Sequence, residues 1–193
     1  MGENTLKISD IPRYVLERFD CIKSKPSMNK LVQFHTTNKY LLMAFSPIHL
    51  NKMGNVVANH EKLSASAVVG NYSDCLIVAL GQHLTRSKHA NVLRRMYGHF
   101  YKKLSKQSQE IIERQIFEYQ HGKNQLSDTL RNLTVHTMDL DSIYLARQSY
   151  FLLFSDKKAV WRMFWIVLLI EVCSSNGWIK DPHVTENWKN LPL

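Results

Sequence analysis

The chain has 193 residues, a formal net charge of +9 and 45% hydrophobic residues. This composition excludes a disordered or collagen-like chain and is sufficient for one domain with its own core. Only seven glycines and five prolines interrupt the sequence. Apolar residues recur at helical spacing, whereas alternating strand patterns are scarce. We therefore expect an all-α fold, with residues 1–193 forming a single compact domain of about seven to nine helices.

The helix boundaries follow from serine caps, prolines and glycines. Pro12 and Pro47 fit the first turn of a helix, Ser105 fits an N-cap, and Gly122 fits the position just past a helix end. The segment KSKPS breaks the first helix. We predict helices over residues 9–21, 28–45, 47–60, 64–82, 85–104, 105–119, 124–137, 140–153 and 157–174.

The last predicted helix contains the most apolar run of the chain. Its uninterrupted part, Met163–Ile170, is bracketed by Arg162 and Glu171. A membrane span needs about 20 such residues. We therefore expect no membrane span and interpret residues 157–193 as an extra buried helix with a tail.

Cysteine usage bears on metals and on location. Cys21, Cys75 and Cys173 lie far apart and form no CxxC pair. This pattern indicates neither a disulfide framework nor a zinc or iron–sulfur site. We expect no metal, no cofactor and no signal peptide, and free thiols fit a reducing, cytoplasmic location.

Positive charge is concentrated in residues 85–106, which contain no Asp or Glu. The basic residues of this segment are Arg86, Lys88, Arg94, Arg95, Lys102, Lys103 and Lys106. Such a concentrated field points to an anionic partner, with phosphate backbones and anionic lipid surfaces as the two candidates.

On one continuous helix over 85–104, these charges form a ridge. Lys88, Arg95, His99 and Lys102 project within about 60° of each other, opposite the apolar side, with Lys103 beside them. The alternative is an ordinary solvated face, neutralised across a hairpin by acidic residues of the next helix: Glu110, Glu113 and Glu118.

Several blocks of the sequence resemble the YbgA-like family, in the same order along the chain. They are LVQFHTTNKYLLMAFSP (31–47), LNKMGNVVA (50–58), KHANVLRRMYGHFYKKLS (88–105), EYQHG (118–122) and YLARQSYF (144–151). The resemblance covers residues 28–154. It implies a bacterial domain of unknown function that occurs alone or fused to a TudS-type thiouracil desulfidase domain. In the fused form, which resembles a tRNA 4-thiouridine desulfidase, it implies that the TudS part carries the iron–sulfur cluster and that the YbgA-like part binds tRNA.

The family motifs map onto individual residues of this chain. The His-x-x-x-Lys, the Ser-Pro, and the Lys-His-x-Asn block correspond to His35 and Lys39, to Ser46 and Pro47, and to Lys88, His89 and Asn91. The resemblance thus implies a pocket lined by His35, Lys39, Ser46 and His89.

The chain also departs from the family pattern, which marks it as a divergent member. Phe45 stands where the family has His, and Gln125 and Thr129 replace two prolines. Gln120 replaces an Arg, and Arg147 replaces a Gly. Any contact made by the missing His or Arg in relatives is lost or replaced here.

Three functions remain open from the sequence. The first is a non-catalytic nucleic-acid-binding module, with tRNA as the expected partner, whose interface residues would be Arg86, Lys88, Asn91, Arg95, His99, Lys102 and Lys103. The second is an enzyme using the family-motif pocket. No paired-carboxylate, HExxH, GxSxG or P-loop signature supports it, and the chain has no cysteine cluster for desulfidase chemistry. The third is an adaptor for a separate TudS-type desulfidase, in which Trp161, Phe164 and Trp165 either dock the partner or, as is commoner for such residues, cover the domain's own core.

Overall fold

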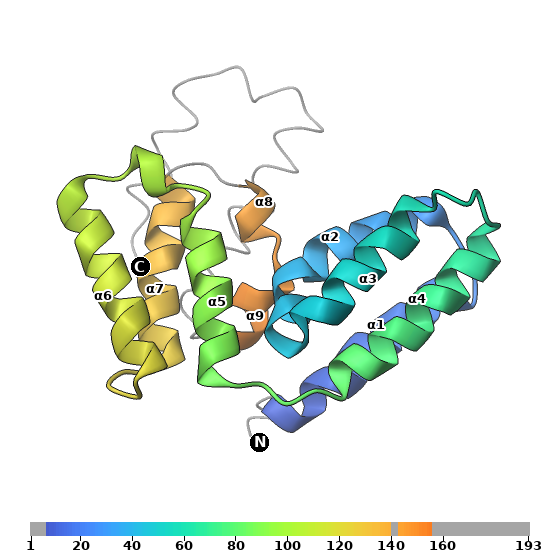
Figure 1. The fold of residues 1–193 in the computed structure, drawn as a ribbon, viewed down its shortest axis with the longest axis horizontal. Helices are drawn as coiled ribbons and strands as arrows, with labels where there is room; N and C mark the ends of the chain where they lie inside the picture. Colours follow the sequence, from blue (N-terminus) through green and yellow to red (C-terminus); the bar gives the residue numbers. More distant parts are fainter. Residues whose placement is uncertain (1–6, 140–142, 156–193) are drawn as a thin grey trace, which may run out of the picture.

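The computed structural model describes residues 7–139 and 143–155 as an all-α fold (Figure 1). These residues contain no β-strand, so the expected fold class is confirmed. The elements in chain order are η1 (Ile8–Asp10), α1 (Ile11–Lys23), α2 (Met28–Phe45), α3 (Pro47–Ala58), α4 (Ala65–Leu80), α5 (Arg86–Tyr97), η2 (Tyr101–Lys103), α6 (Lys106–Gln120), α7 (Leu126–Asp139), α8 (Ile143–Ala146) and α9 (Ser149–Phe154). None of these helices has the length and apolar character needed to cross a bilayer. The helix predicted over 157–174 lies outside the described residues.

Five helices begin directly after a serine or threonine whose side-chain oxygen accepts a backbone N–H. The capping residues are Ser27, Ser46, Ser64, Thr85 and Ser105. Such caps satisfy one of the donors that the first turn of a helix leaves unpaired. Gly122 follows α6 with a φ of 78°, a left-handed conformation that glycine adopts without strain.

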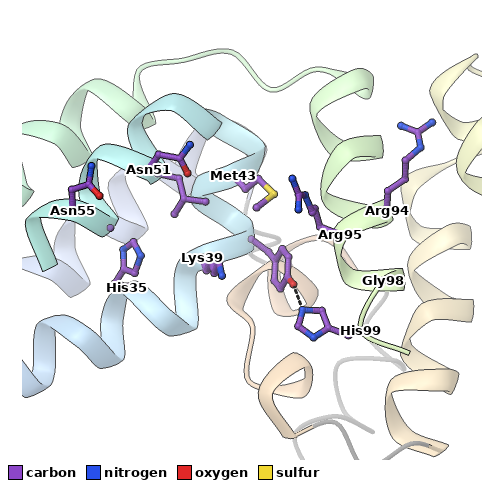
Figure 2. Close-up of a pocket in the computed structure, with 12 residues that line it drawn as sticks. His35, Lys39, Met43, Asn51, Asn55, Arg94, Arg95, Gly98 and His99 are labelled. Carbon is purple, nitrogen blue, oxygen red and sulfur yellow. Dashed lines mark hydrogen bonds between the residues drawn. The ribbon is translucent and has the colours of Figure 1, made fainter. Parts of the chain in front are cut away.

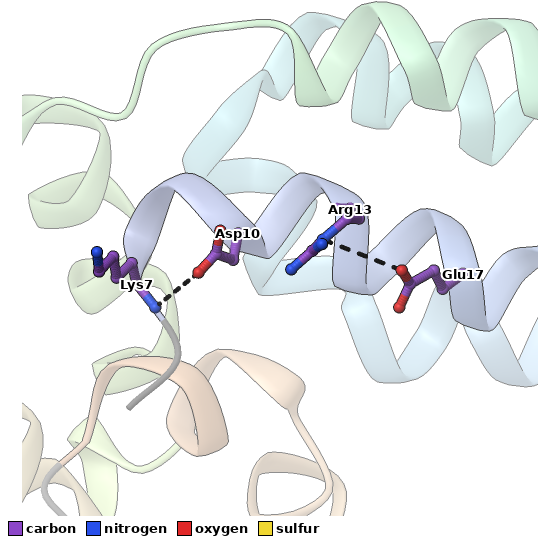
Figure 3. A network of polar contacts seen from close by, with 4 residues as sticks. All are labelled: Lys7, Asp10, Arg13 and Glu17. Carbon is purple, nitrogen blue, oxygen red and sulfur yellow. Dashed lines mark hydrogen bonds and ion pairs between the residues drawn. The ribbon is translucent and has the colours of Figure 1, made fainter. Parts of the chain in front are cut away.

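The start of α1 has polar contacts on its exposed face (Figure 3). The Asp10 carboxylate accepts the backbone N–H of Lys7 at 3.2 Å, and Arg13 pairs with Glu17 at 4.0 Å. An exposed pair of this kind contributes little stability. Burial of one helix face holds α1 in place, through Ile11, Val15, Phe19 and Ile22.

The described residues form two hydrophobic cores, and the helices that build them lie in two neighbouring groups (Figure 1). The amino-terminal core is built by α1–α4, with Phe19, Leu42 and Tyr72 among its fully enclosed side chains. The carboxy-terminal core is built by α5–α9. Helix α2 contributes to both, because Tyr40 and Ala44 pack into the carboxy-terminal core. Helix α2 therefore lies where the two groups of helices meet.

The single helix predicted over 85–104 is wrong, because α5 ends at Tyr97. Gly98 is a poor helix former and donates its N–H to the carbonyls of Arg94 and Met96. The chain then turns so that Phe100 is buried in the carboxy-terminal core, before the short η2.

The single helix predicted over 140–153 is likewise replaced by α8 and α9. The side chain of Gln148 lies at the break and is buried. Its amide donates to the carbonyls of Thr36 at 2.9 Å and Tyr144 at 3.2 Å. These bonds attach the junction to α2, which a continuous helix pattern in the sequence does not reveal.

Candidate functional site

An open cavity of about 890 Å³ lies between α2, α3 and the end of α5 (Figure 2). Its walls come from segments that are distant in sequence. The lining residues are His35, Lys39, Tyr40, Met43, Leu50, Asn51, Gly54, Asn55, Arg94, Arg95, Gly98 and His99. A cavity of this size is typical of sites that hold a small molecule or part of a larger ligand.

The cavity lining carries positive charge and no carboxylate. Lys39 comes from α2, while Arg94 and Arg95 come from α5. Arg94 donates to the neutral side chain of Gln120 at 2.6 Å. Lys39 and Arg95 are exposed and have no hydrogen-bond or ion-pair partner among residues 7–139 and 143–155. The positive field of the cavity is therefore uncompensated by neighbouring side chains.

Two histidines face this positive charge, and each is held by a tyrosine hydroxyl. His35 Nδ1 is 3.1 Å from the hydroxyl of Tyr72, and His99 Nε2 is 2.6 Å from the hydroxyl of Tyr40. Burial, followed by the charge of Lys39, lowers the pKa of both imidazoles below 6.5. Both histidines are therefore neutral at pH 7, where they can donate or accept a hydrogen bond.

Two asparagine side chains belong to the wall that α3 contributes to the cavity. Asn51 and Asn55 are one turn apart on α3, both are exposed, and they lie on the same side of the cavity as His35 (Figure 2). Gly54 lies between them, and a Cβ there would come within 4.0 Å of His35 Nε2. That distance is an ordinary van der Waals contact, so Gly54 lies directly beside the imidazole edge.

The predicted interface residues at the start of α5 are bonded into the fold. Arg86 donates to the carbonyls of Tyr119 at 3.1 Å and Asn124 at 3.2 Å, and its guanidinium lies over the Tyr119 ring. Lys88 Nζ donates to the carbonyls of Phe45 and His83, both at 2.7 Å. These two side chains join the start of α5 to other segments and are not free to hold a phosphate.

The remaining predicted interface residues are exposed, although they do not form one helical ridge. Asn91 and Arg95 lie on α5, whereas His99, Lys102 and Lys103 follow its end. The His99 ring also contacts the Tyr144 ring, with centroids 5.5 Å apart and the planes tilted by 41°. We call Lys39, Arg95, Lys102 and Lys103 the unpaired cations, because they have no hydrogen-bond or ion-pair partner in the described part of the chain.

Neutralisation of this surface across a hairpin is not observed. Glu113 accepts a hydrogen bond from the Tyr97 hydroxyl at 3.2 Å. Within the described ranges, neither Glu113 nor its neighbours Glu110 and Glu118 form an ion pair with a basic residue. The positive surface at the end of α5 is therefore not cancelled by α6.

The four residues of the family-motif pocket do not lie in one pocket of the structure. His35 and Lys39 line the cavity, whereas Ser46 and His89 do not. Ser46 is buried and caps α3 through the backbone N–H of His49. His89 is buried with its Nδ1 at 2.6 Å from the Tyr150 hydroxyl.

Four residues of the cavity lining with polar or charged side chains were absent from the predicted site: Tyr40, Asn51, Asn55 and Arg94. The amides Asn51 and Asn55 carry a signal in sequence, because their spacing of four places both on one face of a helix. Nothing in that spacing shows that this face meets α5, so their role depends on the tertiary arrangement.

Metal ligation finds no support in the described residues. They contain no cluster of three or more His, Cys, Asp or Glu side chains suited to a metal ion. Cys21 and Cys75 are free thiols, one exposed and one partly buried. Cys173 lies outside the described residues.

Comparison with known proteins identifies a family without assigning a function. A family model described as "Protein of unknown function (DUF1722)" matches residues 39–155, more than half of the chain. The chain belongs to this family. Neither the curated proteins nor the solved structures give a match. The matched DUF1722 region includes α3–α9 and the carboxy-terminal part of α2 with Lys39, whereas the cavity residue His35 precedes it.

Proposed function

We propose that this DUF1722 protein is a non-catalytic RNA-binding module that holds the sugar–phosphate backbone of a structured RNA, with tRNA as the expected partner. The cavity between α2, α3 and α5 carries the proposal, because Lys39 and Arg95 face it without a carboxylate partner in the described chain. Phosphate groups are the ligands that such unpaired cations attract most strongly in a nucleic acid.

Exposed positive charge continues beyond the cavity. Lys102 and Lys103 lie in η2, a few residues after the cavity residue His99, and both are exposed. Asn91 is exposed on α5 and offers an amide that can bond to a base or sugar. Together these groups form an interface wider than a single phosphate.

The choice of RNA rests on the resemblance to the YbgA-like family, whose fused members suggest tRNA as the partner. A binding role is favoured over a reaction because Ser46 and His89 are engaged in the fold instead of facing the cavity. The remaining pair, His35 and Lys39, serves as well for binding as for catalysis.

Fluorescence anisotropy with a labelled tRNA transcript at rising salt tests the proposal. About four phosphate contacts, one for each unpaired cation, give a log–log salt slope of about −3 to −4. Affinity should then fall roughly 100-fold between 50 and 200 mM salt. A salt-independent or absent signal would contradict the proposal.

Charge reversal locates the interface. The double variant Lys39→Glu/Arg95→Glu should bind tRNA at least roughly tenfold more weakly, with a salt slope shallower by about two. The matched control is Lys25→Glu/Lys30→Glu, which makes the same charge change at exposed positions outside the cavity lining. Equal losses in the two variants would mean that net charge, not this cavity, governs binding.

A further inference from the structure

The cavity is larger than a phosphate group requires and differs between its two sides. The cations Arg94 and Arg95 belong to the α5 wall, whereas the amides Asn51 and Asn55 belong to the α3 wall (Figure 2). Lys39 lies on α2 between these two walls (Figure 2). A ligand that matched this arrangement would be anionic at one end and would form neutral hydrogen bonds at the other.

Two apolar side chains complete the lining, one on α3 and one on α2. Leu50 is buried directly before Asn51, and Met43 of α2 is partly buried. A nucleobase has apolar faces and an edge that carries both donors and acceptors. An asparagine amide also offers both a donor and an acceptor, so it can pair with such an edge.

The neutral histidines fit the same ligand. His35 and His99 reach the cavity without adding charge at pH 7, because burial and Lys39 keep them deprotonated. An imidazole in this form can accept a hydrogen bond from a ribose hydroxyl or donate one to a base. The cavity thus has partners for phosphate, sugar and base.

We infer that the cavity takes one unpaired nucleotide of the bound RNA, with its phosphate toward Lys39 and Arg95 and its base toward Asn51 and Asn55. This inference rests on the proposed function and adds a preference for RNA with a base outside the helix. A paired base cannot enter, because its hydrogen-bonding edge is occupied and its neighbours are stacked in the duplex.

Two RNA hairpins with the same stem test the inference, one fully paired and one with a single bulged nucleotide. The wild-type protein should bind the bulged hairpin roughly tenfold more tightly, as expected for one well-accommodated base. The variant Asn51→Ala/Asn55→Ala should reduce this preference to less than about twofold. Its affinity for the paired hairpin and its salt slope should stay unchanged, because the cations remain in place.

Circular dichroism of each variant accompanies the titrations, because a lost preference is informative only when the variant is folded. Both asparagines are exposed, and alanine is a better helix former than asparagine, so α3 should keep its structure. The matched control is Asn29→Ala/Asn71→Ala, which removes two exposed amides from α2 and α4 outside the cavity lining. It should keep the full preference for the bulge.

A second readout uses 2-aminopurine as the bulged base in the wild-type complex. Its fluorescence should change on binding, and this change should be absent with Asn51→Ala/Asn55→Ala. Equal affinity of the wild-type protein for both hairpins, with a steep salt slope, would overturn the nucleotide pocket and leave the proposed function intact. Absence of salt-dependent binding to either hairpin would overturn both.

Discussion

At the amino-terminal end of α5 the basic side chains are bonded to the protein backbone, whereas beyond its carboxy-terminal end they lie in solvent. Arg86 and Lys88 each donate to two carbonyl oxygens of other segments. Lys102 and Lys103 have no such partner in the described chain. Both ends contribute equally to the charge concentration seen in sequence, yet only the amino-terminal cations are bonded to the protein.

The difference shows that one basic segment can contain both cations bonded into the fold and cations left exposed. Carbonyl oxygens at helix ends need donors, and a cation is a strong one. Lys88 meets this need for Phe45, the last residue of α2. Where no carbonyl or carboxylate is in reach, as at Arg95, the charge stays available for an external anion.

The largest expected effect concerns the amino-terminal end of α5, where side chains are bonded into the fold. It is a loss of stability at acid pH that depends on His89. Burial among Tyr119, Tyr150 and Phe154 lowers the pKa of His89 to about 4. The unfolded chain takes up this proton near pH 6.5, so between pH 6.5 and 4 the unfolded state binds more protons and stability falls as pH falls. The wild-type protein should lose about 2 to 3 kcal/mol between pH 7 and 4.5 from this group.

Urea unfolding of His89→Asn at both pH values checks this prediction. The variant has no titrating group at this position, so its stability difference between pH 7 and 4.5 should be smaller by that amount. The control His60→Asn alters an exposed histidine of the segment between α3 and α4 and should leave the pH dependence unchanged. An unchanged pH dependence in His89→Asn would show that His89 does not titrate as its burial implies.

A second prediction compares how substitutions at the two ends of α5 change the free energy of unfolding at neutral pH. Lys88→Met keeps most of the aliphatic side chain but removes the donor to Phe45 and His83. Charged hydrogen bonds of this kind are worth about 1.5 to 3 kcal/mol, so unfolding free energy should drop by about 2 to 3 kcal/mol. The exposed Lys102→Met should change it by less than about 0.5 kcal/mol. Similar values for the two variants would remove the distinction between the ends.

The helix starts could be predicted from sequence because their causes are local. Ser105 caps a helix as predicted, and Ser27, Ser46 and Ser64 cap helices that begin within one residue of their predicted starts. The end of α5 could not be predicted, since the turn after Gly98 depends on burial of Phe100 in the carboxy-terminal core. Burial of one side chain in a core formed by distant segments cannot be recognised from the hydrophobic periodicity of its own segment.

The candidate site was predictable only in part for the same reason. The charge of Arg95 and the motif of His35 and Lys39 are visible in sequence. Their meeting in one cavity with Asn51 depends on how α2, α3 and α5 pack. Conversely, Arg86 and Lys88 resemble the other cations in sequence, and only their carbonyl partners distinguish them.

The smallest expected effect defines how far the proposed interface extends beyond the cavity. Lys102→Gln/Lys103→Gln removes the two unpaired cations of η2 without touching a cavity residue. If both contact phosphates, tRNA affinity should fall roughly tenfold and the salt slope should become shallower by about two. Anisotropy titrations at several salt concentrations measure both quantities, and thermal unfolding should be unchanged because neither side chain has a partner to lose.

The control for that pair is Lys25→Gln/Lys30→Gln, which lowers the net charge equally on the segment between α1 and α2 and on the first turn of α2. A loss confined to the η2 variant would place RNA along the exposed surface that continues from the cavity. Equal losses would instead mean that charge acts at long range, as expected when counterions are released without a defined contact. In that case the carboxy-terminal end of α5 would be no more specialised for binding than any other basic part of the surface.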